Sequence, residues 1–159
     1  TFNTKGLLDS LSDHFQIIDL GWVNDQETLR DALVASDIFL MPSIQEAFGV
    51  MAIEAMACSK PVIVFEGTSL PAVTFSPEVG IAVPAKNSKA LQKAIETLIN
   101  NPKERINRGK KGREVAELHY SDETFSKRLA DLYKSLKNKS SYNMNNYNYS
   151  FNINIYFNS

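Results

Sequence analysis

The sequence predicts an α/β protein in which a parallel sheet has helices on both faces. Residues 38–41 and 61–65 are short, continuously apolar runs, as expected of strands that are buried on both sides. Between them, residues 50–57 consist almost entirely of good helix formers. A strand, a helix and a second strand in this order form a βαβ unit, whose crossover is right-handed and whose strands are parallel.

The region before this unit predicts one further strand and one further helix. Residues 16–20 read QIIDL, a short strand-like run that ends at Gly21. Asn24 or Asp25 can then cap a helix that extends to about Val34, because such side chains accept hydrogen bonds from the N–H groups of a first helical turn.

Proline residues separate the elements of the βαβ unit itself. Pro42 ends the first strand, and residues 45–49 form a loop before the helix. Lys60 precedes Pro61, and the helix should end there because the residue before a proline is disfavoured in the helical region.

Three more helices are expected after the second strand of the unit. One follows Ser88, a second is opened by Asn101 as cap with Pro102 and Glu104 in its first turn, and a third follows Ser121. The apolar stripes are Leu91, Ala94, Ile95, Leu98 and Ile99 in the first of these helices, and Phe125, Leu129, Leu132, Tyr133 and Leu136 in the last. Both stripes have the spacing of packing surfaces.

The loop at residues 45–49 is the candidate ligand site. In open α/β sheets, ligands bind at the carboxyl ends of strands, where loops lead into helix N-termini. The N–H groups from about Gly49 to Ala52 and the positive end of the helix dipole suit a phosphate. Glu46 and Glu54 could flank one ligand that carries hydroxyl-rich groups on either side of a diphosphate. Two glutamates at such positions also fit solvated partners of the helix dipole.

Bulk composition argues against an electrostatic nucleic-acid binder. The 159 residues carry a net charge near −1 and are 43% apolar, which allows a buried core and supplies no overall basic field. One cysteine, Cys58, cannot form an internal disulfide, so we expect a buried thiol in a reducing compartment, the cytoplasm or its membrane face. No signal-peptide pattern follows Thr1, and no apolar run approaches the length of about 18 residues that a membrane span requires.

The remaining polar segments predict no metal site. His14 and His119 stand far apart and are expected to be ordinary histidines. Residues 103–113 hold six basic side chains, which fit a solvated helix face, with contact to anionic lipid as the alternative. Residues 141–159 contain no charged side chain and are rich in Asn and Tyr, so we expect a disordered tail outside the folded domain of residues 1–140.

Several short sequence motifs resemble those of a known protein family. They are DIFLMPS at residues 37–43, EAFGVMAIEAMA at 46–57, PVI at 61–63, LPAV at 70–73 and GIAV at 80–83. From about Ile17 to Tyr133, the chain resembles the C-terminal, donor-binding domain of the family 4 glycosyltransferases. These are retaining enzymes in which two Rossmann-like domains face each other across a cleft, the GT-B fold. The resemblance implies transfer of a sugar from a nucleotide sugar to a hydroxyl acceptor in polysaccharide or glycoconjugate synthesis.

The resemblance also implies roles for individual residues. Glu46 would be catalytic, in contact with hydroxyls of the donor sugar or with the charge that develops at its anomeric carbon. The residues implied to bind the donor are Phe48, Gly49, Val50, Met51 and Glu54, with Gly67 and Thr68 as further loop contacts. Glu54 would take the ribose hydroxyls. Neither a metal nor a cofactor is expected, because helix dipoles and basic side chains neutralise the leaving phosphate.

The chain departs from the family pattern in three respects. Ser59 stands where a glycine would usually serve a left-handed helix end, and Ala72 replaces a glutamate after Pro71. The basic pair that clamps the diphosphate and the N-terminal acceptor domain are both missing. We therefore expect a truncated donor-binding part that is inactive alone, from a parent enzyme for which membrane association stays open. The alternative is a non-catalytic Rossmann-like module that acts as a weak nucleotide binder or an interaction surface.

Overall fold

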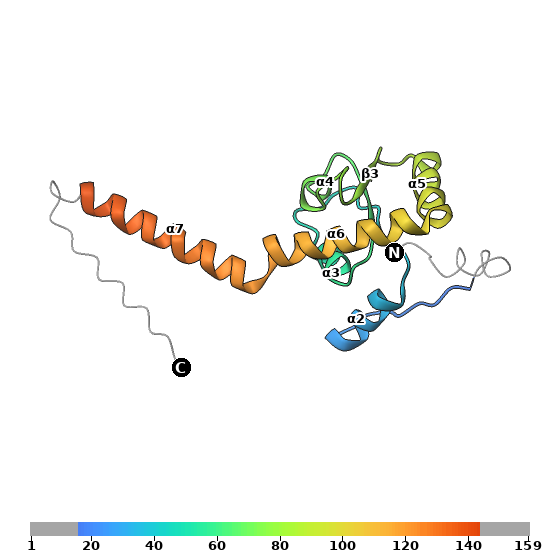
Figure 1. The fold of residues 1–159 in the computed structure, drawn as a ribbon, viewed down its shortest axis with the longest axis horizontal. Helices are drawn as coiled ribbons and strands as arrows, with labels where there is room; N and C mark the ends of the chain where they lie inside the picture. The colour runs from blue at the N-terminus through green and yellow to red at the C-terminus, as the bar shows by residue number, and fades with distance from the viewer. Residues whose placement is uncertain (1–15, 144–159) are drawn as a thin grey trace.

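The computed structural model describes residues 16–143, which form a small parallel sheet with helices on both faces (Figure 1). Among these residues the strand order is β1 (Phe39–Met41), β2 (Val62–Phe65) and β3 (Ile81–Val83). Both pairings are parallel, with Leu40 opposite Ile63 and Val64 opposite Ala82. The predicted βαβ unit and the predicted fold class are confirmed.

Of the six described helices, all but the short α4 were predicted from the sequence. They are α2 (Gln26–Ala35), α3 (Val50–Ala57), α4 (Leu70–Val73), α5 (Ser88–Asn100), α6 (Pro102–Tyr120) and α7 (Asp122–Asn143). Asp25 caps α2, and the hydroxyl and amide of Thr28, followed by the Glu27 amide, hold the pKa of this carboxyl below its ordinary value. Asn101 caps α6 by accepting from the Glu104 amide at 3.1 Å. Both caps confirm the sequence prediction.

The two faces of β2 carry two parts of the core. Val62 and Val64 pack toward α3 and α4, while Ile63 and Phe65 pack toward α5. All four side chains are buried. The central strand is therefore apolar along its whole length, which is the pattern of a parallel strand with helices on both sides.

The first predicted strand is wrong. Residues 16–20 adopt no strand, and Ile18 and Leu20 are exposed. Because a strand is stable only when its backbone groups pair with a neighbour, an isolated apolar run does not form one, and no described strand pairs with these residues. Leu40 of β1 is also 40% exposed, since β1 lies at an edge of the described sheet.

The end of α3 confirms the left-handed turn predicted at Ser59, whose φ is 59°. The Ser59 amide donates to the Met56 carbonyl and the Lys60 amide to the Ala55 carbonyl, both at 2.9 Å. This is the Schellman arrangement, in which two otherwise unpaired carbonyls of the last turn find donors. Serine adopts it without the freedom of glycine.

The basic segment at residues 103–113 is not simply a solvated face, and that prediction needs correction. Arg108 donates from Nη1 to the carbonyls of Pro77, Val79 and Gly80 at 2.7 to 3.2 Å. Arg105 donates to the Leu98 carbonyl and Arg113 to the Ala57 carbonyl. The three lysines at positions 103, 110 and 111 are exposed, as predicted. Guanidinium groups of α6 therefore join loops and helix ends.

The last helix leads away from the sheet (Figure 1). Its apolar stripe at Phe125, Leu129, Leu132, Tyr133 and Leu136 is exposed, between 39% and 65%. It is thus not a packing surface within residues 16–143. The helix continues to Asn143, past the predicted domain boundary at residue 140, and the rest of the predicted tail lies outside the described residues. No helix in residues 16–143 has the length and apolar character needed to span a bilayer.

Candidate functional site

The loop of residues 42–49, called the first loop below, leads from the carboxyl end of β1 into α3. Gly49 is the residue before the helix, with a left-handed φ of 87°. A Cβ at this position would lie 2.3 Å from Cδ2 of Leu70, a side chain that is fully buried. Both the backbone conformation and the close approach therefore require glycine.

The first turn of α3 presents backbone donors that are not used within the described chain. Among residues 16–143, the amides of Val50 and Met51 reach no acceptor, whereas the Ala52 amide donates to the Gly49 carbonyl at 3.0 Å. The side chains of Val50 and Met51 are exposed at 58% and 37%. This turn therefore offers N–H groups and the positive end of a helix dipole to solvent.

Glu46 is held at the edge of this turn by two hydrogen bonds. Its Oε1 accepts from the Phe48 amide at 3.2 Å, and its backbone carbonyl accepts from Oγ of Ser69 at 3.1 Å. Ser69 precedes α4, so the loop of residues 66–69, called the second loop below, is joined to the first loop through this bond. The second oxygen of the Glu46 carboxylate has no partner among the described residues.

The second loop contains Gly67 and Thr68, the two further donor contacts that the family resemblance implies. Gly67 is exposed, with a left-handed φ of 80° and open space where a Cβ would stand. Thr68 uses its hydroxyl within its own turn, since Oγ1 donates to the Phe65 carbonyl at 3.3 Å and accepts from the Leu70 amide at 3.1 Å. Gly67 thus leaves its backbone accessible, while Thr68 mainly shapes the loop.

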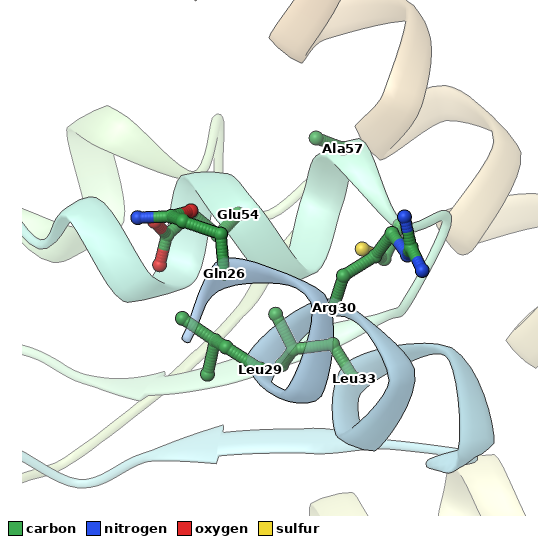
Figure 2. Close-up of a pocket in the computed structure, with 7 residues that line it drawn as sticks. Gln26, Leu29, Arg30, Leu33, Glu54 and Ala57 are labelled. Carbon is green, nitrogen blue, oxygen red and sulfur yellow. The ribbon is translucent and has the colours of Figure 1, made fainter. Parts of the chain in front are cut away.

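Glu54 lies in a hollow between α2 and α3 with a volume of about 160 Å³ (Figure 2). The hollow is lined by Gln26, Leu29, Arg30, Leu33, Glu54, Ala57 and Cys58. One wall is apolar, from the leucines of α2; Gln26 lies beside the Glu54 carboxylate, whereas the guanidinium of Arg30 points toward the opposite end of the hollow. Glu46 is not among the lining residues, so the two glutamates lie in different surroundings.

Sequence reasoning missed the contribution of α2 to this hollow. The segment was predicted to be a helix, but nothing in its pattern indicates that Gln26 lies beside Glu54 or that Arg30 lines the same hollow. Cys58 was expected to be buried; it is half-buried at the rim of the same hollow.

Aromatic side chains border the first loop on the other side. The side chain of Phe48 is 49% exposed, and its ring packs edge to face against the ring of Tyr120, with 6.0 Å between the ring centroids. The Tyr120 hydroxyl donates to the Val73 carbonyl at 3.0 Å. Burial raises the pKa of the Tyr120 phenol, and the positive charge of Arg128 partly offsets this.

The predicted absence of a metal site remains a prediction. Within residues 16–143, no three His, Cys, Asp or Glu side chains converge as ion ligands. The ring of His119 packs on the ring of Phe75, with 4.9 Å between the ring centroids, and Nδ1 of His119 lies 3.3 Å from a guanidinium nitrogen of Arg128. This histidine therefore has a local packing role.

Comparison with known proteins establishes the family. A family model described as "Glycosyl transferases group 1" matches residues 7–115, more than half of the chain. The chain belongs to the group 1 glycosyltransferases. One relative, a D-inositol 3-phosphate glycosyltransferase of Corynebacterium urealyticum, is 33% identical over 113 residues, which are 69% of this chain and 26% of that protein. The chain spans between 17% and 33% of the length of the curated relatives that it matches here, so it corresponds to only part of each of them.

Solved glycosyltransferase structures share the fold. Sucrose-phosphate synthase of Thermosynechococcus elongatus superposes with a TM-score of 0.76 at 31% identity, over 86% of this chain and 34% of that protein. The C-terminal domain of a group 1 family glycosyltransferase of Francisella tularensis superposes with a TM-score of 0.63 at 26% identity, over 75% of this chain and 63% of that chain. These likenesses confirm the predicted Rossmann-like α/β fold of a GT-B C-terminal domain.

Proposed function

We propose that this chain is the donor-binding part of a retaining, family 4 glycosyltransferase that takes its sugar from a nucleotide sugar. The observation that carries the proposal is the first turn of α3. There the amides of Val50 and Met51 are unused among the described residues, and they follow Phe48, whose amide donates to the Glu46 carboxylate, and Gly49, whose left-handed backbone starts the helix. Membership of a sugar-transferring family supports the same function.

The diphosphate of the donor would lie at this helix end. Backbone N–H groups and the helix dipole stabilise negative charge there, and they are in place before the reaction begins. The charge that develops on the leaving diphosphate can therefore be neutralised without a metal ion. The exposed backbone at Gly67 would add a contact from the second loop.

The two glutamates would bind opposite ends of the donor. Glu46 has one carboxylate oxygen tied to the Phe48 amide and the other unpartnered among the described residues, so it can accept from a sugar hydroxyl or face a cationic anomeric carbon. Glu54 would accept from the ribose hydroxyls at the hollow between α2 and α3, with Gln26 as a further polar contact. A carboxylate matches paired hydroxyls because it accepts from both.

The acceptor would be a hydroxyl of a growing polysaccharide or glycoconjugate, bound by a domain outside this sequence. On this proposal the chain binds donor but does not turn it over. A non-catalytic module that binds nucleotide weakly is the second candidate, and it is favoured by the lack of a basic side chain at the first turn of α3. The two candidates differ in whether a sugar on the diphosphate increases affinity.

Calorimetric titration tests the proposal. UDP, GDP and their glucose and mannose derivatives are titrated into the wild-type chain, the Glu54→Ala variant and the Glu114→Ala variant. Glu114 is an exposed glutamate of α6, so its replacement is a matched control for the loss of one helical carboxylate. Loss of hydrogen bonds to a charged group costs about 1.5–3 kcal/mol, or roughly tenfold to a hundredfold in affinity.

We expect Glu54→Ala to weaken binding by this factor and Glu114→Ala to leave it unchanged. Equal heats for the wild-type chain and Glu54→Ala would refute the assignment of Glu54. Equal affinity for a nucleoside diphosphate and its sugar derivative, with no effect of Glu46→Gln, would favour the weak nucleotide module.

A further inference from the structure

Tyr120, the last residue of α6, connects two segments that are far from it in sequence. Its ring meets Phe48 of the first loop edge to face at 6.0 Å, with an angle of 84° between the ring planes. Its hydroxyl donates to the carbonyl of Val73, the last residue of α4, at 3.0 Å. One side chain thus contacts the segments that follow both β1 and β2.

The Val73 carbonyl needs a side-chain donor for a local reason. A helical carbonyl accepts from the amide four residues later, but residue 77 is a proline and has no N–H. Among residues 16–143, no backbone amide outside the regular helices and strands donates to this carbonyl, and Val73 itself is buried. The Tyr120 hydroxyl supplies the donor, and a buried carbonyl without one would be costly.

The bond to Val73 also acts on the second loop. The four-residue helix α4 follows directly on Ser69, whose hydroxyl donates to the Glu46 carbonyl. Glu46 in turn accepts from the Phe48 amide. The path from Tyr120 through α4, Ser69 and Glu46 therefore returns to Phe48, the residue that the ring of Tyr120 contacts directly.

We propose that Tyr120 is a positioning residue of the donor site, which fixes the first loop and the second loop relative to each other. The inference rests on the proposed function, because it takes the two loops as parts of the donor site that must be held in a fixed conformation. Tyr120 does not touch the donor itself. It acts by holding the Phe48 ring, and with it the Glu46 carboxylate, against the first turn of α3.

Two substitutions separate the two contacts of Tyr120. Tyr120→Phe keeps the ring edge against Phe48 and removes the donor to Val73, while Tyr120→Leu keeps apolar bulk and removes both contacts. Tyr133→Leu is the matched control, since Tyr133 is 60% exposed on the next helix. Backbone ¹⁵N relaxation of residues 46–49 and 67–74 reports loop order without any ligand, and calorimetry with UDP and GDP reports binding.

We expect Tyr120→Leu to lower the order parameters of residues 46–49 while amide protection in β2 is retained. Its affinity for the nucleotide that the wild-type chain binds should fall about tenfold, because loops that the aromatic pair and the hydrogen bond had ordered must then be ordered when the nucleotide binds. Tyr120→Phe should shift mainly the amides of residues 70–74 and weaken binding less. Tyr133→Leu should change neither quantity.

Wild-type order parameters at residues 46–49 in Tyr120→Leu would overturn the inference. If that variant does not fold, unchanged amides at residues 70–74 in Tyr120→Phe would overturn it instead. If neither UDP nor GDP binds the wild-type chain, the proposed donor site fails, and the ligand-free order parameters still decide whether Tyr120 orders the loops.

Discussion

The two ends of α3 use their backbone groups in different ways. At the carboxyl end, the turn at Ser59 satisfies the carbonyls of the last turn, and Arg113 donates to the Ala57 carbonyl at 2.9 Å. Gly109 of α6 packs so closely that a Cβ there would lie 2.1 Å from the Ser59 carbonyl oxygen. This end is closed by protein.

The amino end of the same helix is open. The amides of Val50 and Met51 have no acceptor among residues 16–143, and both side chains are exposed. Glycine occurs at both ends, but at the closed end it belongs to the neighbouring helix, whereas at the open end Gly49 belongs to the turn itself.

This difference shows how a small fold can present unused hydrogen-bond donors without becoming unstable. A helix anchored at its carboxyl end by packing and by charge-assisted hydrogen bonds keeps the direction of its amino end constant. Donors held in a constant direction bind an anion without a large ordering cost. Substitutions at the closed end should therefore change stability, and substitutions at the open end should change binding more.

The largest effect on stability is expected for Gly109→Ala. Alanine favours a helix over glycine by about 1 kcal/mol, so propensity alone predicts a gain. The contact with the Ser59 backbone should outweigh it and lower the free energy of unfolding by about 3 kcal/mol, since one of the two helices must shift. Urea unfolding monitored by circular dichroism measures this change.

Gly112→Ala is the matched control for that experiment. Gly112 is buried on the same helix, but a Cβ there would meet the nearest atom, Cγ of Met56, at 3.4 Å, an ordinary contact. It should leave stability unchanged or raise it slightly. A stabilised Gly109→Ala protein would contradict the account of the closed end.

At the open end, Gly49→Ala should cost about 2 kcal/mol of stability and at least tenfold in nucleotide affinity. Part of the cost is the left-handed φ, which for alanine is roughly 1 kcal/mol, and the rest is the contact with the buried Leu70. Gly67→Ala has a similar φ of 80° and no neighbour within 4 Å, so it measures the first part alone. Equal losses of stability in the two variants would show that Leu70 moves aside freely.

Local signals in the sequence were enough to predict part of the fold. Elements defined by local signals were predicted correctly: the continuous apolar run of β2, the helix at residues 50–57, and the left-handed turn at Ser59. Each depends on residues within a few positions of one another, where backbone propensity and capping chemistry decide the outcome. The candidate site came from the loop between two such elements.

Features that depend on distant partners could not be predicted in the same way. The run at residues 16–20 has strand-like composition, but a strand also needs a neighbour to pair with. Arg113 and Tyr120 donate hydrogen bonds to carbonyls that lie 56 and 47 positions away in the sequence. Nothing in the sequence around either residue indicates which carbonyl it will bind. Because Pro77 has no N–H, the sequence does indicate that a helical Val73 carbonyl would lack its usual backbone donor. The short helix α4, in which Val73 lies, was not predicted.

The smallest predicted effect concerns alkaline pH and again separates the two ends of α3. Tyr120 borders the open end, where burial raises the pKa of its phenol above the ordinary value of 10.0 and the nearby Arg128 partly offsets this. Because the folded state holds the phenolic proton more tightly than the unfolded state, the related stability is fully present below about pH 10 and is lost as the pH rises through the folded-state pKa.

The difference in unfolding free energy between the wild-type chain and Tyr120→Phe should therefore shift in favour of the variant above about pH 10. A parallel pH dependence of the wild-type and Tyr120→Phe proteins would mean that the Tyr120 phenol is as accessible in the folded state as in the unfolded state. Any alkaline loss of stability that disappears with Tyr120→Phe is therefore assigned to the Tyr120 phenol beside the open end of α3.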